Sequence, residues 1–189
     1  MCFEHAVPVT VVAVAPGRVL TGSADKTVKV WRNGACERTI EAHTRLDDRY
    51  HEGIQAVAVL PGATRFVSCG SFDETAKLWT LDGALERAFA MDAGVLRRDL
   101  HCVAALPDGV HFVVGLGGGP NKGEVRLYRV DGTLVHVFPR HDLRVHAVAM
   151  TPDGQHIISG SDDNLVKVWS VASKSLVTTC NGHATYVMA

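Results

Sequence analysis

The sequence predicts an all-β fold built from four copies of one four-stranded antiparallel unit, because three markers of different chemistry recur along its 189 residues. A turn proline falls at Pro16, Pro61, Pro107 and Pro152. An apolar residue opens a strand at Val9, Ile54, Leu100, Val145 and Val187. An aromatic residue closes a strand at Trp31, Trp79, Tyr128 and Trp169. The proline and the opening residue advance by 45 or 46 positions between the four full copies, a period typical of repeat architectures.

The first copy predicts four short strands near residues 9–14, 18–22, 27–32 and 36–40. Apolar residues alternate with polar ones or run for a few positions, and each run ends at a turn. Pro16-Gly17 separates the first two strands, since proline presets the first turn residue and glycine supplies a positive φ. Asn33-Gly34 separates the last two and predicts a type I′ hairpin. No segment of the sequence shows a convincing helical periodicity longer than two turns, which favours strands throughout.

The later copies repeat these turns. The first turn reads L-P-G-A at 60–63, L-P-D-G at 106–109 and T-P-D-G at 151–154, against A-P-G-R at 15–18. Asp82-Gly83 and Asp131-Gly132 take the place of Asn33-Gly34 and also predict type I′ hairpins. The fourth copy has Val171, Ala172 and Ser173 there, a weaker turn sequence.

Polar residues recur with the strands. The loop before each third strand reads T-G-S-A-D-K-T at 21–27, C-G-S-F-D-E-T at 69–75 and S-G-S-D-D-N-L at 159–165. An aspartate stands six residues before the closing tryptophan, at Asp25, Asp73 and Asp163. A histidine stands four residues before the opening apolar residue at His5, His141 and His183, and His43 lies on the far side of an insertion in the second copy.

These motifs resemble those of the WD-repeat β-propeller family. Asn181-Gly182-His183 provides the family's G-H pair, and the S-x-D-x-T-V-K-V-W strand is its most recognisable line, although no tryptophan here is followed by aspartate. The resemblance implies a propeller of four-stranded antiparallel blades in a single domain over 1–189. We expect four blades plus the start of a fifth, in an open or partial ring. The blades would span about 5–42, 43–91, 92–140 and 141–182, with 183–189 opening the fifth.

In such propellers the repeated His, Ser or Thr, Asp and Trp form a structural hydrogen-bond network. The resemblance carries that role to His5, Thr21, Asp25, Trp31, His43, Asp73, Trp79, His141, Ser159, Asp163 and Trp169. The second copy is expected to have Cys69 at the hydroxyl position. The third copy replaces the set with Val114, Lys122 and Tyr128 and has no upstream histidine. Loss of the whole set together is expected, because a partial network leaves buried polar groups unpaired.

Composition narrows the function classes. The formal net charge of −1 provides no field that would attract nucleic acid, so no direct nucleic-acid binding is expected. The sequence has no long apolar span and no basic N-terminal leader, which predicts no membrane segment and no signal peptide. Five cysteines without a C-x-x-C pair favour reduced, buried thiols and an intracellular protein, cytoplasmic or nuclear.

No sequence feature predicts an enzyme, a metal site or a cofactor. The glycine-rich G-L-G-G-G-P-N-K-G-E at 115–124 fits neither common nucleotide-binding pattern, and a strand rather than a helix follows it. Ser161 and Asp163 with His141 match the structural network and lack the G-x-S-x-G elbow of a hydrolase.

Features that do not recur are the candidates for partner binding. Insertions at 44–53 and 92–99 lengthen the connections between blades, on the face that carries the aspartate loops. The residues expected on this face are Arg45, Asp47, Asp48, Arg49, Tyr50, Phe72, Arg97, Arg98, Arg144 and Tyr186. Arginine and tyrosine are enriched at interface hot spots, although solvated loops without a function remain an equal alternative.

The sequence therefore predicts a non-enzymatic scaffold that binds a peptide or protein on the top face of the propeller. The alternative is a receptor for a phosphorylated or acidic motif, such as a ubiquitin-ligase substrate adaptor, which would use Arg49, Arg97, Arg98 and Arg144. Four copies and a fraction fall short of the usual blade number. Three explanations are open: a fragment of a larger propeller, an arc completed by self-association or a partner, or a tight four-blade ring.

Overall fold

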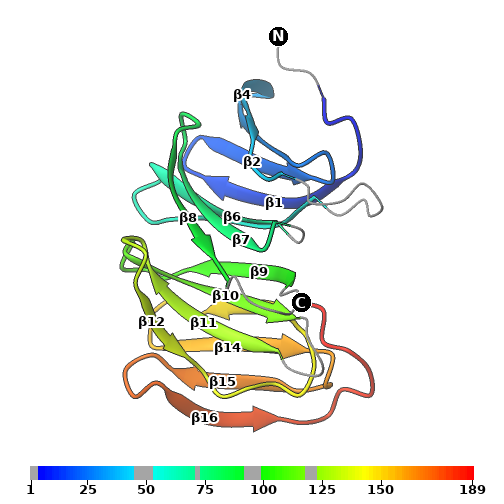
Figure 1. Cartoon of the computed structure of the whole chain (residues 1–189), viewed down its shortest axis with the longest axis vertical. Coiled ribbons are helices and arrows are strands. Elements are labelled where there is room, and N and C mark those ends of the chain that lie inside the picture. The colour runs from blue at the N-terminus through cyan, green and yellow to red at the C-terminus, as the bar shows by residue number, and fades with distance from the viewer. Residues whose placement is uncertain (1–3, 45–52, 71–72, 92–98, 118–122) are drawn as a thin grey trace.

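The computed structural model describes residues 4–44, 53–70, 73–91, 99–117 and 123–189. These residues form four four-stranded antiparallel sheets, and no helix is found among them. Within each sheet the strands lie side by side in chain order. Figure 1 shows the first two sheets in its upper half and the other two below. The expected all-β architecture of four-stranded blades is confirmed.

The four sheets, here called blades, have these strands. Blade 1 contains β1 (Val9–Ala15), β2 (Arg18–Ser23), β3 (Thr27–Arg32) and β4 (Ala35–Glu41). Blade 2 contains β5 (Ile54–Val59), β6 (Arg65–Gly70), β7 (Thr75–Thr80) and β8 (Leu85–Ala90). Blade 3 contains β9 (Asp99–Ala105), β10 (His111–Gly117), β11 (Glu124–Arg129) and β12 (Leu134–Val137). Blade 4 contains β13 (Val145–Met150), β14 (His156–Ser161), β15 (Val166–Ser170) and β16 (Ser175–Cys180).

The turn glycines have the backbone conformation that the sequence predicts, but two of the predicted hairpins are of another type. Gly17, Gly62, Gly109 and Gly154 all have positive φ, as the repeated first turn requires. Asn33 and Gly34 both have positive φ (51° and 79°), which confirms a type I′ hairpin. The same prediction for Asp82-Gly83 and Asp131-Gly132 is wrong, because only the glycines have positive φ there.

The second and third blades instead close this hairpin with a three-residue loop that ends in a left-handed glycine. Thr80 N donates to Ala84 O at 2.9 Å, and Gly83 N donates to Thr80 O at 3.0 Å. The extra loop residue in blade 2 is Leu81, which is buried against blade 1. An apolar side chain anchored in the core therefore lengthens the loop by one residue.

Each blade has two distinct apolar faces. The aromatic face carries the strand-closing aromatic residue together with its cross-strand neighbours, for example Val57, Phe66 and Trp79 in blade 2. The opposite, aliphatic face carries residues such as Leu20, Val28 and Val30 in blade 1. In a strand, successive side chains point to opposite faces, so the alternation in the sequence creates both.

The hydrophobic core lies between blades. The aliphatic face of blade 1 packs on the aromatic face of blade 2 in one cluster of buried residues. Blades 2 and 3, and then blades 3 and 4, meet in the same way in two further clusters. Phe66, Phe112 and Ile157 occupy equivalent places on the three covered aromatic faces and are fully buried. The repeat therefore stacks by one rule, aliphatic face on aromatic face.

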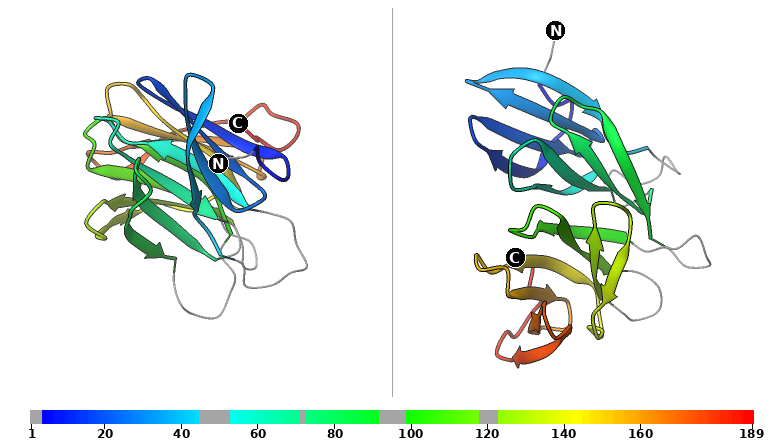
Figure 2. Two further views of the ribbon diagram at one scale, coloured as in Figure 1. Left: turned by 90° about the horizontal axis from the view of Figure 1, so that it is seen from above. Right: turned by 90° about the vertical axis from the view of Figure 1, so that its left-hand side faces the viewer.

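The four blades form an open arc. The inner strands contact one another in sequence, β1 with β5, β5 with β9 and β9 with β13, and the described residues make no comparable contact between β13 and β1. Figures 1 and 2 place blade 1 and blade 4 at opposite ends of the molecule. The arc confirms the expected open ring. Among the described residues no blade lies on the aromatic face of blade 1, while Val187 packs against Gly160 of blade 4 at the place where a next blade would begin.

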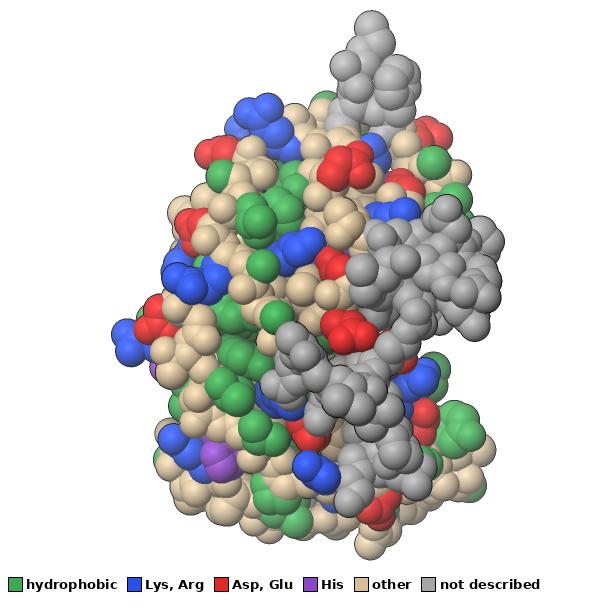
Figure 3. Space-filling view, in the orientation of Figure 1, with side chains coloured by type: hydrophobic (Ala, Val, Ile, Leu, Met, Phe, Trp, Pro, Cys, Tyr) green, Lys and Arg blue, Asp and Glu red, His purple; other side chains and the backbone are tan. Residues whose placement is uncertain are grey.

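Charge is spread over the surface. Figure 3 shows acidic, basic and hydrophobic side chains interspersed on the face that it draws. Cys69 and Cys102 are buried free thiols, and burial raises the pKa of Cys102 to about 12. Cys36, on the outer strand β4, is disulfide-bonded, so the expectation of reduced cysteines is wrong for this residue. Within the described ranges, no helix could span a membrane.

Candidate functional site

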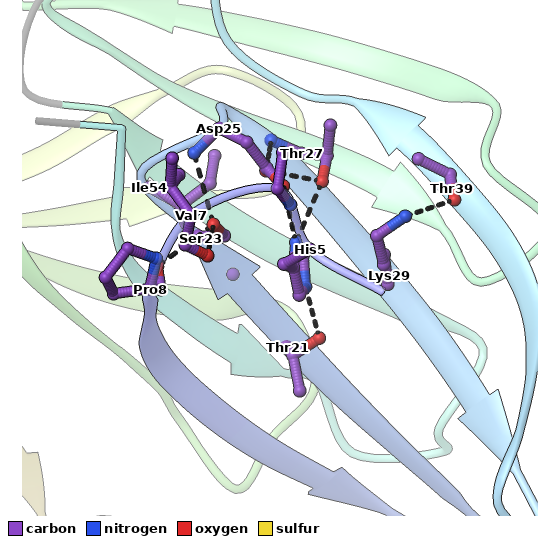
Figure 4. Close-up of polar contacts among 12 residues, drawn as sticks. His5, Val7, Pro8, Thr21, Ser23, Asp25, Thr27, Lys29, Thr39 and Ile54 are labelled. Atoms are coloured by element: carbon purple, nitrogen blue, oxygen red, sulfur yellow. Dashed lines mark hydrogen bonds and ion pairs between the residues drawn. The ribbon is translucent and has the colours of Figure 1, made fainter. Parts of the chain in front are cut away.

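The repeated polar residues of blade 1 form a continuous hydrogen-bond chain, shown in Figure 4. His5 Nδ1 lies 2.8 Å from Asp25 Oδ2, and His5 Nε2 lies 2.7 Å from Thr21 Oγ1. Trp31 Nε1 donates to the same Thr21 oxygen at 2.8 Å. Asp25 also accepts hydrogen bonds from the backbone and hydroxyl of Thr27. The chain ties the segment before β1 to β2 and β3.

For a neutral histidine, one arrangement of protons satisfies every link. The ionised Asp25 only accepts, so Nδ1 of His5 carries the proton and donates to it. Nε2 then accepts the hydrogen of the Thr21 hydroxyl, whose oxygen accepts from Trp31. A neutral histidine thus completes the chain without an unpaired polar atom. This histidine holds the aspartate in place and has no lone pair left to accept a substrate proton.

Blade 4 contains the same chain. His141 Nδ1 lies 2.8 Å from Asp163 Oδ2 and Nε2 lies 2.8 Å from Ser159 Oγ, while Trp169 Nε1 donates to Ser159 at 2.9 Å. His141, Ser159 and Trp169 are all buried.

Blade 2 departs from the sequence prediction. His43 Nε2 lies 2.7 Å from Ser68 Oγ, and Trp79 Nε1 donates to Ser68 at 3.0 Å. The expectation that Cys69 occupies the hydroxyl position is therefore wrong. Asp73 completes the chain 2.8 Å from His43 Nδ1 and also pairs with Lys77 at 2.9 Å.

A one-residue shift in strand register explains the exchange. In blades 1 and 4 the residue opposite the tryptophan lies twelve positions before it, as Val19 pairs with Trp31 and Ile157 with Trp169. In blade 2 Phe66 pairs with Trp79, thirteen positions before it. A one-residue slip moves every side chain of a strand to the other face. Ser68 therefore joins the tryptophan, and Cys69 turns into the core beside blade 3.

Blade 3 has a different buried polar group in place of this chain. Val114 occupies the hydroxyl position and is fully buried, and the Tyr128 hydroxyl donates to Met91 Sδ at 3.1 Å. Arg126 makes two hydrogen bonds to Glu124 Oε2, at 2.9 and 2.8 Å, and both side chains are buried. Lys122, the expected replacement for the aspartate, lies outside the described residues.

Burial and hydrogen bonds shift the pKa values of Asp73, His43 and His141 in the networks. Burial alone would raise the pKa of Asp73, but hydrogen bonds from His43, Lys77 and Thr75 outweigh it and lower that pKa to about 2. Burial lowers the pKa of His43 and of His141, although their aspartate partners act in the opposite direction. Both shifts favour neutral His43 and His141 and an ionised Asp73, in agreement with the proton arrangement given above for a neutral histidine.

Most of the expected partner-binding residues fall outside the described ranges. Arg45, Asp47, Asp48, Arg49, Tyr50, Phe72, Arg97 and Arg98 belong to this group. Arg144 and Tyr186 are described, and both are exposed. Arg144 directly precedes Val145, the first residue of β13, and Tyr186 holds the equivalent position in the sequence repeat, before Val187. Both lie on the top face, defined here as the side of the blades that carries the aspartate loops and the connections between blades.

A β-bulge occurs at the same place in every inner strand. The ladder skips Thr10 in β1, Gln55 in β5, His101 in β9 and His146 in β13. A bulge turns its extra residue out of the regular alternation and is often found beside functional sites. The sequence analysis missed these residues, because the signal is a break in pairing rather than a motif.

The bulge residues of blades 3 and 4 belong to a polar cluster at the top face, which we call the top cluster: Asp99, His101, Arg144, His146 and Asp162. The rings of His101 and His146 lie 5.3 Å apart. His146 Nε2 lies 2.9 Å from Asp162 Oδ1, and Arg144 Nη2 lies 3.9 Å from Asp99 Oδ2. Gly117 makes room for Arg144, since a Cβ there would collide with the arginine stem.

Nε2 of His101, in the top cluster, is buried and has no hydrogen-bond partner in the described part of the chain. Burial, aided by the charges of Arg144 and His146, lowers the pKa of His101 to about 4, so the ring is neutral near pH 7. A neutral imidazole with an open nitrogen can donate to or accept from a ligand group. Across the described ranges, no group of His, Cys, Asp and Glu is arranged to hold a metal ion.

The opposite end of the arc is apolar. A cavity of about 630 Å³ lies there, lined by the repeated turn prolines and by Val14, Val59, Ala105 and Met150. The sequence contained the signal for this cavity, because one proline per blade at the same position places all four at the same end of the arc. The centre of the arc is thus polar at the top face and apolar at the bottom.

Comparison with known proteins agrees with this architecture. The family model described as "WD domain, G-beta repeat" matches residues 2–32, 34–80 and 132–170, more than half of the chain. A solved structure of the WD40 β-propeller domain of Doa1 superimposes with a TM-score of 0.80 at 24% identity, covering 98% of this chain and 57% of that one. The likeness to Doa1 shows the fold alone.

Curated relatives are longer proteins. Nuclear distribution protein PAC1 of Arthroderma otae is 23% identical over 174 residues, which is 82% of this chain and 36% of the relative. Pre-mRNA-processing factor 17 of Saccharomyces cerevisiae is 26% identical over 80% of this chain and 31% of its own length. WD repeat-containing protein 18 of Mus musculus is 31% identical over 60% of this chain and 27% of its own. The chain spans about a third of the length of these relatives, and its matched repeats, blade topology and stacking show that it belongs to the WD-repeat family of β-propeller proteins.

Proposed function

We propose that this chain is a non-enzymatic interaction scaffold that binds a peptide or a protein segment at its top face, over the top cluster. An intracellular location, cytoplasmic or nuclear, is part of this proposal. The observation that supports binding at the top face is that the residues at the bulge positions differ between blades. Thr10 is satisfied internally, since its hydroxyl donates to backbone oxygens of Gly22 and Ile54. The equivalent positions in blades 3 and 4 instead hold two histidines among charged groups.

The chemistry of the top cluster suits polar recognition. It presents an arginine, two carboxylates and a buried imidazole with one unpaired nitrogen, so it offers donors and acceptors to a backbone or side chain. Exposed Tyr186 belongs to the same face, and tyrosine is favoured at interfaces. A ligand that places a hydrogen-bonding group at His101 Nε2 would give this nitrogen a partner. Because an unpaired buried nitrogen costs free energy, such a ligand would bind more tightly than one without the group.

A phosphorylated or acidic motif is the alternative ligand. Of the four arginines that the sequence suggested for it, Arg144 is the one within the described residues, and its guanidinium faces Asp99. The carboxylate offsets its positive charge, so this contact does not favour an anionic ligand. We keep that ligand class as one outcome of the experiment below.

The test is a peptide array, with and without phosphorylated members, probed with the purified chain. We expect Arg144→Ala combined with His146→Ala to weaken binding by about tenfold or more, the effect of losing about 1.4 kcal/mol. Gln155→Ala is the matched control, because Gln155 is exposed in a turn at the bottom. Binding that survives the top-face variant but is lost in Met150→Asp would move the site to the apolar cavity. Binding that requires phosphate and fails in Arg144→Ala alone would establish the alternative.

A further inference from the structure

The top cluster has no counterpart in the first two blades. Three positions of the repeat contribute to it: the residue before the strand-opening residue, the bulge residue, and the residue before the network aspartate. In blades 1 and 2 the sequence has uncharged residues at all of these positions: Pro8, Thr10, Ala24, Gly53, Gln55 and Phe72. In blade 4 they are Arg144, His146 and Asp162, and blade 3 adds Asp99 and His101. The top cluster is therefore a local feature of blades 3 and 4 and not a property of the repeat.

Two buried atoms of the top cluster, His101 Nε2 and Asp162 Oδ1, have no hydrogen-bond partner in the described part of the chain. Both adjoin the imidazole of His146. Its ring lies 5.3 Å from that of His101, and its Nε2 lies 2.9 Å from Asp162 Oδ1 without making a hydrogen bond. A buried polar atom without a partner costs free energy, which a ligand that supplies the missing bond recovers. The two atoms therefore mark one place where a polar group of a ligand can bind.

The chemistry of these two atoms favours a ligand group that donates. An ionised carboxylate only accepts hydrogen bonds, and a neutral imidazole accepts at the ring nitrogen that has no proton. An ammonium or guanidinium group only donates, so it can serve both atoms, whereas an ionised phosphate or carboxylate has no hydrogen for Asp162. The charges agree with this choice. With both imidazoles counted as neutral, the cluster has the two carboxylates of Asp99 and Asp162 against the one guanidinium of Arg144, an excess of one negative charge.

We propose that the top cluster binds a lysine or arginine side chain of the bound peptide, which donates to Asp162 Oδ1 and His101 Nε2. This inference rests on the function proposed above and names the ligand group that the top face selects. Arg144 keeps its contact with Asp99 in this arrangement. Because the Arg144 side chain is 43% exposed, it can also donate to backbone carbonyls of the same peptide.

Paired peptides test the inference on the full 189-residue chain. An array of short peptides of random sequence carries each peptide twice, once unchanged and once with every lysine and arginine replaced by glutamine. We expect basic peptides to dominate the binding sequences, and their glutamine counterparts to bind about tenfold or more weakly, because a hydrogen bond to a charged group is lost. Asp162→Asn should weaken binding of the best basic peptide by a similar factor. Asp131→Asn is the matched control, since it removes a half-exposed carboxylate in the turn between β11 and β12.

A double-mutant cycle separates a direct contact from a structural effect of the variants. Replacing the basic residue of the peptide by glutamine and Asp162 by asparagine removes the same contact, so the two losses of affinity should not add. His101→Gln keeps an acceptor near the place of Nε2 and should bind nearly as well as the wild type, whereas His101→Phe should bind about tenfold more weakly. Fluorescence polarisation with a labelled peptide measures each affinity.

The outcomes distinguish this inference from the proposed function. Glutamine counterparts that bind as well as the basic peptides, losses that add, or binding sequences dominated by acidic or phosphorylated peptides would each overturn the inference. In these cases, loss of binding in Arg144→Ala combined with His146→Ala would still establish binding at the top face. A wild-type chain that binds no peptide of the array would overturn both.

Discussion

At the scale of single residues, the hydroxyl group between histidine and tryptophan holds each network together. It is the one atom that both accepts from the indole and donates to the imidazole. In blade 2 this atom belongs to Ser68, which is fully buried. Removing it leaves two buried nitrogen atoms without their partner.

We expect Ser68→Ala to lower the free energy of unfolding by about 1–3 kcal/mol, the cost of leaving buried polar groups unpaired. Urea denaturation followed by tryptophan fluorescence measures it. Ser159→Ala should have a similar effect, because it makes the equivalent bonds in blade 4. Ser173→Ala, at an exposed turn, is the control. A Ser68→Ala protein as stable as the wild type would contradict the hydrogen-bond assignment.

The titrating groups predict sensitivity to acid. The folded pKa values of His43, His101 and His141 lie below the usual value of 6.5, so the unfolded chain takes up protons before the folded chain does. Their stabilising contribution is complete above pH 6.5 and is lost as the pH falls, until His101 titrates at about 4. Asp73 adds a second loss between its ordinary value of 3.8 and about 2.

Unfolding free energies measured over a series of pH values should therefore decrease continuously below pH 6.5. His101→Gln should flatten part of the first decline, since glutamine keeps a polar group at the bulge but does not titrate. An unchanged slope in that variant would show that His101 is protonated equally well in the folded and unfolded chain.

At the scale of elements, blade 3 shows how a repeat tolerates the loss of its network. Val114 and Tyr128 replace the hydroxyl and the tryptophan, and a buried Arg126–Glu124 pair appears on β11. Arg140 also lies near Glu124, with Nε 3.4 Å from Oε1. The sequence predicted that the set would be lost together but did not reveal the ion pair that stands there.

Breaking this pair should cost more than removing it. We expect Glu124→Gln to lower the free energy of unfolding by about 3 kcal/mol, because the buried charge of Arg126 would lose the Glu124 carboxylate. The double variant Glu124→Leu with Arg126→Met should recover most of that loss. Thermal and urea unfolding of the wild type, the single variant and the double variant decide this. A double variant less stable than Glu124→Gln would show that the pair itself provides net stability.

Strand register limits what can be read from sequence at this scale. Aligning the loops T-G-S-A-D and C-G-S-F-D places Cys69 opposite Thr21. The pairing of β6 with β7 differs by one residue, and the hydroxyl comes from Ser68 instead. Cys69 then takes the position that Gly22 has in blade 1, directly after the hydroxyl residue. Its small side chain belongs to the same buried cluster as Leu100 of blade 3. Spacing along the chain cannot reveal such a slip, because the packing of two blades selects it.

At the scale of the whole molecule, ligand binding is linked to stability. A ligand that binds only the folded chain raises its apparent stability with ligand concentration. A peptide that binds the top face should therefore raise the melting temperature of the wild-type chain as the peptide concentration increases. It should not raise that of Arg144→Ala combined with His146→Ala. Scanning calorimetry or fluorescence melting measures both, and a constant wild-type value would argue against binding at the top face.

The sequence by itself determined the repeat, the four-stranded pattern of each described blade, most of the turns and the residue types of the hydrogen-bond networks, because these depend on local alternation and on turn residues. The type of two hairpins, the hydroxyl in blade 2 and the top cluster were decided only by tertiary structure. Each of these depends on how one blade packs against the next, and residues about 45 positions apart meet only when the blades stack.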